Sequence, residues 1–184
     1  MLYVQESLGP DEKLIHIGSF HWFYNFSAVM NLVLGLVACI AIIAAGIYLP
    51  QNMNIPLFDD FYVDPQAGML EQIKSTHPFV RIAAFLALII GFGKFAHMMI
   101  IKATTEIAVT SSRIVYKRGV VARYVGEMSI DRIEGVNVLQ SFLGRLLNFG
   151  RVMVRGMGVG EVVLPTIEDP ITFRKAIDKA RTMS

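Results

Sequence analysis

The four histidines, His16, His21, His77 and His97, are the side chains in this chain best suited to metal or proton chemistry. No pair of them has the spacing of a zinc site. The single cysteine, Cys39, excludes both a cysteine-based metal site and an intrachain disulfide. No serine or aspartate falls in a recognisable nucleophile motif. We therefore expect no catalytic, cofactor-binding or metal-binding residues, and no enzymatic activity.

The glycine-rich run Gly156–Gly160 resembles a nucleotide-binding loop at first sight. The following segment, Glu161–Pro165, has the composition of a strand. A dinucleotide site needs a helix N-terminus at that point, because the helix end binds the pyrophosphate. The run is better interpreted as a hairpin turn.

Three arginines, Arg145, Arg151 and Arg155, are the charged residues with the clearest binding potential. They fall on consecutive predicted elements, where they could contact anionic lipid headgroups or the carboxylates of a partner. Arg151 and Arg155 have the same strand parity and would project from one face of a sheet. A solvated sheet face is the alternative, because the three do not form a dense cationic cluster.

Lys94 and His97 lie in an apolar segment and would share one face of a helix. Polar residues at such positions could line a proton or ion path in an oligomeric, channel-like protein. No carboxylate accompanies them in the segment. The alternative is that the lysine reaches the headgroup layer from near the helix end.

The elements that carry these residues belong to an unusually apolar chain. Of its 184 residues, 54% are hydrophobic and 17% are charged, whereas soluble domains are about 45–50% apolar and about 25% charged. Ala28–Ile47 has no charged side chain and matches the roughly 20 residues that cross a bilayer. Trp22, Tyr24 and Tyr48 flank it, as interfacial aromatic residues do. Pro50 is expected to end the helix.

A second apolar segment, Val80–Ile101, can span a bilayer if its terminal cations reach the headgroups. Ala83, Ala87 and Gly91 recur in it at every fourth position and form a ridge of small residues. Such ridges let helices pack closely in lipid.

A shorter ridge, Ala41 and Ala45, lies in the first span. The ridges of one chain could pack on each other. Alternatively, they could join different chains into a homo-oligomer.

The distribution of cationic residues predicts the orientation in the membrane. More Lys and Arg residues follow the second span than precede it. Those that follow it closely are Lys102, Arg113, Lys117 and Arg118. The positive-inside rule makes that side cytoplasmic. Both termini are then cytoplasmic, and the Pro50–Pro78 loop, with a predicted short helix at Met69–Lys74, lies outside.

Residues 103–184 change character to short runs rich in Val, Ile and Tyr, which are typical of strands. The predicted strands are Thr105–Thr110, Arg113–Arg118, Val120–Met128, Gly135–Gln140, Arg151–Arg155 and Glu161–Pro165. Ile130–Ile133 predicts one helical turn, and Phe142–Asn148 predicts a short helix with Ser141 as its N-cap. Asp169-Pro170 provides the N-cap and first proline of a final amphipathic helix.

Several short motifs occur in a specific order along the chain. They are Gly9–Lys13, His21–Phe23, the Thr110 to Arg113 turn, Gly119, Glu127 with Asp131-Arg132-Ile133, the Gln140–Leu147 segment, and Asp169, Pro170 and Phe173. Together they resemble the bacterial pleckstrin-homology-like domain family of the second type, in particular its short two-span membrane members.

The resemblance implies an α+β membrane protein of the bacterial inner membrane. Its fold would be a strongly bent β-sheet, or split barrel, capped by one C-terminal helix, and Lys13–Phe20 could add a strand before the first span. The expected divisions are a cytoplasmic tail (1–25), two transmembrane helices (26–49 and 79–102), an extracytoplasmic loop (50–78) and the cytoplasmic domain (103–184).

We expect a membrane-anchored, non-enzymatic interaction or scaffold module. Its expected partners are membrane lipids, an unidentified protein and a second copy of the chain, but not nucleic acid. The alternatives are a small oligomeric transport or channel-like protein and a module that senses anionic lipid. The resemblance does not decide among these, because a fold does not carry a function.

Overall fold

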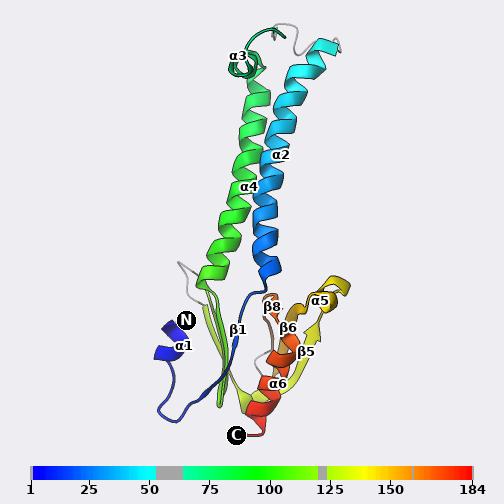
Figure 1. The fold of residues 1–184 in the computed structure, drawn as a ribbon. Coiled ribbons are helices and arrows are strands. Elements are labelled where there is room, and N and C mark those ends of the chain that lie inside the picture. Colours follow the sequence, from blue (N-terminus) through cyan, green and yellow to red (C-terminus); the bar gives the residue numbers. More distant parts are fainter. Residues whose placement is uncertain (1, 53–63, 120–123, 159, 184) are drawn as a thin grey trace. The chain divides into compact units, whose positions relative to one another are not determined.

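The computed structural model describes residues 2–52, 64–119, 124–158 and 160–183. The chain forms two compact units. Phe26–Met98 makes the helical unit, and Met1–Asn25 together with Met99–Ser184 makes the β unit (Figure 1).

Two long apolar helices, α2 (Trp22–Asn52) and α4 (Pro78–Thr104), contain the two predicted spans. Both are long and apolar enough to cross a membrane. Many of their large apolar side chains are exposed, such as Phe85 at 61%. Water penalises such exposure and a bilayer does not. A short helix, α3 (Met69–Ser75), confirms the predicted helix in the loop, whose residues 53–63 lie outside the described part of the chain.

The expectation that Pro50 ends the first helix is wrong, because α2 continues to Asn52. A proline removes one backbone hydrogen bond and crowds the carbonyl of the preceding turn. Long apolar helices tolerate this loss when local adjustments satisfy the freed backbone groups.

Glycines set the contact between the two long helices within the helical unit. A Cβ atom added at Gly35 would lie 2.7 Å from the Cα of Gly91. A Cβ added at Gly46 would lie 2.5 Å from Cγ1 of Val80. The helix backbones can therefore approach this closely only without side chains at these positions.

The first sheet of the β unit is antiparallel, with strand order β1-β2-β3-β4. Its strands are β1 (Leu14–Gly18), β2 (Glu106–Thr110), β3 (Arg113–Arg118) and β4 (Tyr124–Ser129). The strand predicted within Lys13–Phe20 is β1. The strand predicted at Val120–Met128 is β4, and residues 120–123 of that prediction lie outside the described residues.

The second antiparallel sheet has the order β5-β6-β7, with β8 also paired to β6. Its strands are β5 (Ile133–Leu139), β6 (Phe149–Gly156), β7 (Gly160–Val163) and β8 (Ile167–Glu168). The 3-10 helix η2 (Ile130–Arg132) precedes β5, and the short helix α5 (Phe142–Leu146) lies between β5 and β6 in the sequence. The hairpin turn predicted for the glycine-rich run is confirmed, because it joins β6 to β7. Gly158 and Gly160 adopt positive φ angles of 71° and 81° there, which glycine does without strain.

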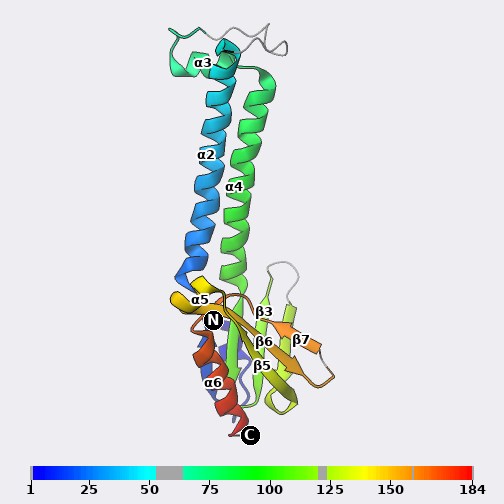
Figure 2. The same ribbon diagram turned by 90° about the vertical axis from the view of Figure 1, so that its right-hand side faces the viewer.

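The C-terminal helix α6 (Pro170–Arg181) contacts β1 and β2 of one sheet and β5 and β6 of the other. Asp169 caps it as predicted, because its side chain accepts a hydrogen bond from the Thr172 N–H. Phe173 is fully buried and belongs to the core cluster shared with Ile107 and Val152. Figure 2 shows α6 alongside the strands. The predicted α+β fold, with a β structure capped by one C-terminal helix, is confirmed, and its strands form two antiparallel sheets.

A short N-terminal helix, α1 (Leu2–Glu6), was not predicted from the sequence. Its Val4 is buried in a small cluster with Ala108 and Val115. These two residues alternate with the inward-facing core residues of β2 and β3, so α1 covers the outer face of the first sheet.

Candidate functional site

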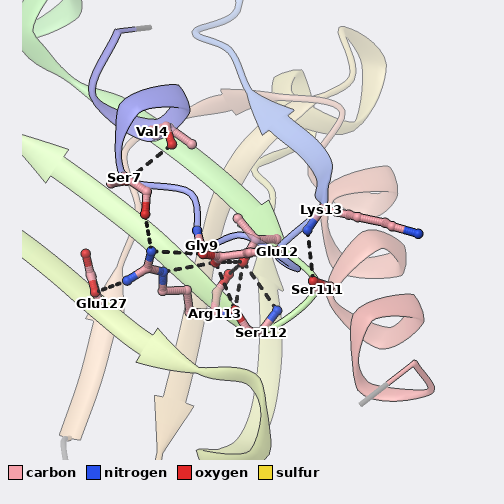
Figure 3. Close-up of polar contacts among 10 residues, drawn as sticks. Val4, Ser7, Gly9, Glu12, Lys13, Ser111, Ser112, Arg113 and Glu127 are labelled. Atoms are coloured by element: carbon pink, nitrogen blue, oxygen red, sulfur yellow. Dashed lines mark hydrogen bonds and ion pairs between the residues drawn. The ribbon is translucent and has the colours of Figure 1, made fainter.

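A nearly buried carboxylate, Glu12, collects polar groups from the loop before β1 and from the β2–β3 turn. Its side chain is 7% exposed. Arg113 donates to it through Nη2 at 2.9 Å and through Nε at 3.0 Å. Thr110 Oγ1 and Ser112 Oγ donate to Oε1 at 2.6 and 2.9 Å. The Gly9 N–H donates to Oε2 at 3.0 Å (Figure 3).

Arg113 also extends this cluster to two further groups. Its Nη1 lies 2.7 Å from Oε2 of Glu127 on β4, and its Nη2 donates to the Ser7 carbonyl at 2.6 Å. The guanidinium therefore joins the first residues of the chain to two strands of the first sheet. Figure 3 shows these contacts converging on Arg113.

The electrostatics of the cluster keep Glu12 ionised. Burial raises the pKa of Glu12, but the hydrogen bonds from Gly9, Thr110, Arg113 and Ser112 outweigh it and lower the pKa to about 2. The hydrogen bond to Glu12 raises the pKa of Arg113. Both oxygens of Glu12 accept hydrogen bonds already, so the carboxylate suits a structural ion pair better than a general base.

Glu12 was not predicted from the sequence as a partner of Arg113. Both residues belong to motifs that carry the family resemblance, Gly9–Lys13 and the Thr110 to Arg113 turn. The opposite charges of these two motif residues were the feature from which the pair could have been predicted. The sequence around each residue does not show that the two segments lie close together in the fold.

A second ion pair holds α1 against the first sheet. Lys117 Nζ lies 3.0 Å from Oε1 of Glu106, and the Val4 N–H donates to Oε2 of Glu106 at 3.3 Å. The Lys117 ammonium also lies 4.8 Å from the centroid of the Tyr3 ring. The N-terminal helix is thus held by charge as well as by apolar contact.

The three candidate arginines lie at exposed positions of the second sheet and of α5. Arg151 and Arg155 are exposed on β6 while Val152 and Val154 are buried, as their parity predicts. Arg155 forms an ion pair with Glu161 of β7, which balances its charge. Arg145 lies on α5 and is exposed.

The candidate residues of α4 fall on different sides of the helix. Gly91 is buried against Gly35, and Ala87 contributes its carbonyl to that contact. Ala83, Lys94 and His97 are exposed.

The contact between the two helices lies within one chain, which is one of the two alternatives for the small-residue ridge. Its partner in α2 is Gly35 rather than the ridge of Ala41 and Ala45. Ala41 is exposed and Ala45 is half-buried.

The segment around α5 is held by polar contacts but has an apolar surface. Ser141 Oγ accepts a hydrogen bond from the Gly144 N–H at 3.1 Å, as an N-cap should. Gln140 Nε2 donates to the carbonyls of Gly144 and Phe149 at 3.2 and 3.1 Å. The exposed apolar side chains of α5 are Phe142, Leu143 and Leu146.

The start of β6, three residues after α5, lies beside the residues that begin α2. The Phe149 ring stacks on the Phe23 ring, with centroids 5.0 Å apart and planes 9° apart. The centroid of the His21 ring lies 5.1 Å from the centroid of the Phe149 ring. The sequence predicts the α5 helix and its cap, but neither the contact of Phe149 with Phe23 nor the exposure of the apolar side chains of α5.

Within the described ranges, the structure contains no group of three or more His, Cys, Asp or Glu side chains that could hold a metal ion.

The model of the bacterial PH domain family matches residues 13–181. No curated protein and no solved structure matches the chain.

Proposed function

The chain belongs to the bacterial PH domain family, and from this membership we propose that it is a membrane-anchored, non-enzymatic interaction module. In this proposal α2 and α4 cross the bacterial inner membrane, and the β unit meets its partners in the cytoplasm. The lysines and arginines that follow the second span support this orientation.

The observation that carries the proposal is the pairing of β1 with β2. β1 precedes the first candidate span and β2 follows the second, and the two strands pair from Leu14↔Thr110 to Gly18↔Ile107. A sheet formed from both sides of a helical hairpin requires both flanks to be on one side of the membrane. Such an arrangement ties a folded domain to the bilayer at two points.

The strand edges of the domain favour binding of a protein partner. Among the described strands, β1 and β4 are the outer strands of the first sheet, and β5 and β7 are outer strands of the second. Edge strands have backbone groups that an extended segment of a partner can pair with. The saturated Glu12 cluster, by contrast, favours a structural over a catalytic role for the most buried charges.

Orientation is tested by thiol labelling in intact cells. With Cys39→Ser as the background, Gln66→Cys should react with a membrane-impermeant maleimide, and Thr182→Cys should react only after lysis. The opposite result would place the domain outside the cytoplasm.

Interaction is tested by a photo-crosslinking residue introduced in living cells. We expect discrete protein adducts at Val163, which is 45% exposed on β7, and lipid adducts at Ile40, which is 59% exposed on α2. Adducts to lipid alone at both positions would contradict an interaction module. Ion flux through proteoliposomes would instead favour the channel-like alternative, with Lys94 and His97 as the residues to substitute.

Self-association is part of the same proposal. Gly91 is used within one chain, so a contact between chains would use the exposed small residues, such as Ala83. Mass measurement in nanodiscs should show an oligomer that Ala83→Leu weakens. A monomer across micromolar concentrations would remove self-association from the proposal.

A further inference from the structure

The largest exposed apolar side chains of the β unit include three on one short helix. Phe142 is 84% exposed, Leu146 is 72% exposed and Leu143 is 53% exposed. Leu139, at 49%, adds to them at the end of β5. Single exposed apolar residues are ordinary, but a group of this size on one element indicates a surface that is covered in the working protein.

This surface is a fixed part of the domain. A Cβ atom added at Gly144 would lie 2.6 Å from the Phe149 carbonyl oxygen, and one added at Gly150 would lie 2.8 Å from the Leu139 carbonyl oxygen. Together with the hydrogen bonds of Gln140, these close backbone contacts hold α5 against β6. The apolar side chains are therefore presented outward by a packed segment.

The position of α5 in the domain identifies what covers it. Phe149, which follows α5, stacks on Phe23, and Phe23 is in the first turn of α2. The neighbouring Trp22 is 56% exposed, and tryptophan is common at the level of the headgroups. The residues at the start of a membrane-spanning helix lie at the bilayer surface, whatever the tilt of the helix. α5 ends at Leu146, three residues before Phe149, and is therefore close to that point.

The charges of the surface fit a bilayer. α5 carries no acidic residue and has one cation, Arg145. Arg151 faces Leu139 in the register of β5 and β6 and is exposed. Apolar side chains interleaved with arginine suit the boundary between acyl chains and anionic headgroups.

We propose that the α5 surface, formed by Leu139, Phe142, Leu143, Arg145, Leu146 and Arg151, inserts into the interfacial layer of the bilayer that holds α2 and α4. The apolar side chains contact the upper acyl chains, and the two arginines contact phosphate groups of anionic lipids. The domain then has a third membrane contact besides the two helix ends. This contact holds the β4 and β7 edges in a defined orientation for a protein partner.

Depth measurements on the full-length chain in proteoliposomes test this. Trp22→Phe removes the only tryptophan, and Phe142→Trp or Met183→Trp then introduces a single one. Met183 is 61% exposed and lies next to the C-terminus, and Figure 2 shows the C-terminus at the opposite end of the β unit from α5. Both sites are exposed, so neither substitution disturbs the core.

In vesicles with brominated acyl chains, the tryptophan at position 142 should emit at shorter wavelength and be quenched severalfold more than the one at position 183. Aqueous iodide should quench the two in the opposite order. Equal accessibility to iodide at both positions would overturn the proposal. A blue-shifted tryptophan at position 142 that brominated lipid does not quench would also overturn it, because the surface would then be covered by protein.

The role of the arginines is tested by adding anionic lipid to zwitterionic vesicles. Anionic lipid should increase the quenching at position 142, and the double variant Arg145→Gln with Arg151→Gln should abolish this increase. Lys175→Gln, an exposed cation on α6, is the matched control and should retain it. An unchanged response in the double variant would overturn the assignment of the headgroup contacts.

Discussion

Glu12 and Arg113 are joined by two hydrogen bonds of 2.9 and 3.0 Å, although they lie 101 residues apart in the sequence and both candidate spans separate them. The pair fastens the segment before the first candidate span to the strands that follow the second. It therefore closes the helical hairpin of α2 and α4 within the β unit itself. Its strength can be measured.

Glu12→Gln should destabilise the β unit by about 1.5–3 kcal/mol, the range for hydrogen bonds to charged groups. The reason is that Arg113 keeps its charge and loses its buried partner. Chemical denaturation in detergent, followed by circular dichroism, measures the change. Glu127→Gln is the matched control, because the Glu127 side chain is 36% exposed and exposed pairs contribute about 0–1 kcal/mol. Equal effects of the two substitutions would contradict the assigned role of Glu12.

Stability should fall in acid because of Glu12. Its pKa is lowered from the ordinary value of 4.5 to about 2 in the folded protein. A lowered pKa stabilises the fold above pH 4.5, and this contribution is lost as the pH falls towards 2. A lowering of the pKa from 4.5 to about 2 corresponds to about 3–4 kcal/mol at most. The free energy of unfolding measured from pH 6 to pH 2.5 should therefore decrease less steeply in Glu12→Gln than in the wild type. Identical slopes would show that Glu12 does not titrate in this way.

Gly91→Leu should weaken the packing of α2 on α4, because a Cβ at position 91 would lie 2.7 Å from the Gly35 Cα. Overpacking of this kind costs on the order of 1–3 kcal/mol. Gly93→Leu is the control, since nothing lies within 4 Å of a Cβ at that position. Thermal unfolding in nanodiscs should separate the two variants. A loss of stability in both would indicate a general effect of leucine in α4.

Phe173→Ala should cost about 3–5 kcal/mol, as expected for removing a fully buried phenylalanine. Its ring is 0% exposed and lies edge-on to His16 of β1, with centroids 5.7 Å apart. Ile171→Ala, at 47% exposure on the same helix, should be close to neutral. Denaturation of the two variants under the same conditions makes the comparison. A mild effect at Phe173 would mean that α6 does not plug the sheets.

Local features of the sequence were enough to predict most of the secondary structure. The uncharged run of Ala28–Ile47 predicts a long apolar helix that spans a membrane, because a helix in a soluble protein is seldom apolar on all sides over this length. Asp169-Pro170 predicts the start of α6, because capping involves only residues within one helical turn. The parity of Arg151 and Arg155 likewise depends only on strand geometry. These predictions rest on interactions between near neighbours.

Tertiary structure decided which of these elements meet. The pairing of β1 with β2 and the contact of Glu12 with Arg113 join segments on either side of the two spans. The approach of Gly35 to Gly91 selects one face of α4 from several that carry small residues. The position of Phe149 beside Phe23 depends on how β6 is placed by the rest of its sheet. Contacts of this kind arise from the packing of the whole chain, because the entropy lost in bringing distant segments together is compensated only when their surfaces fit.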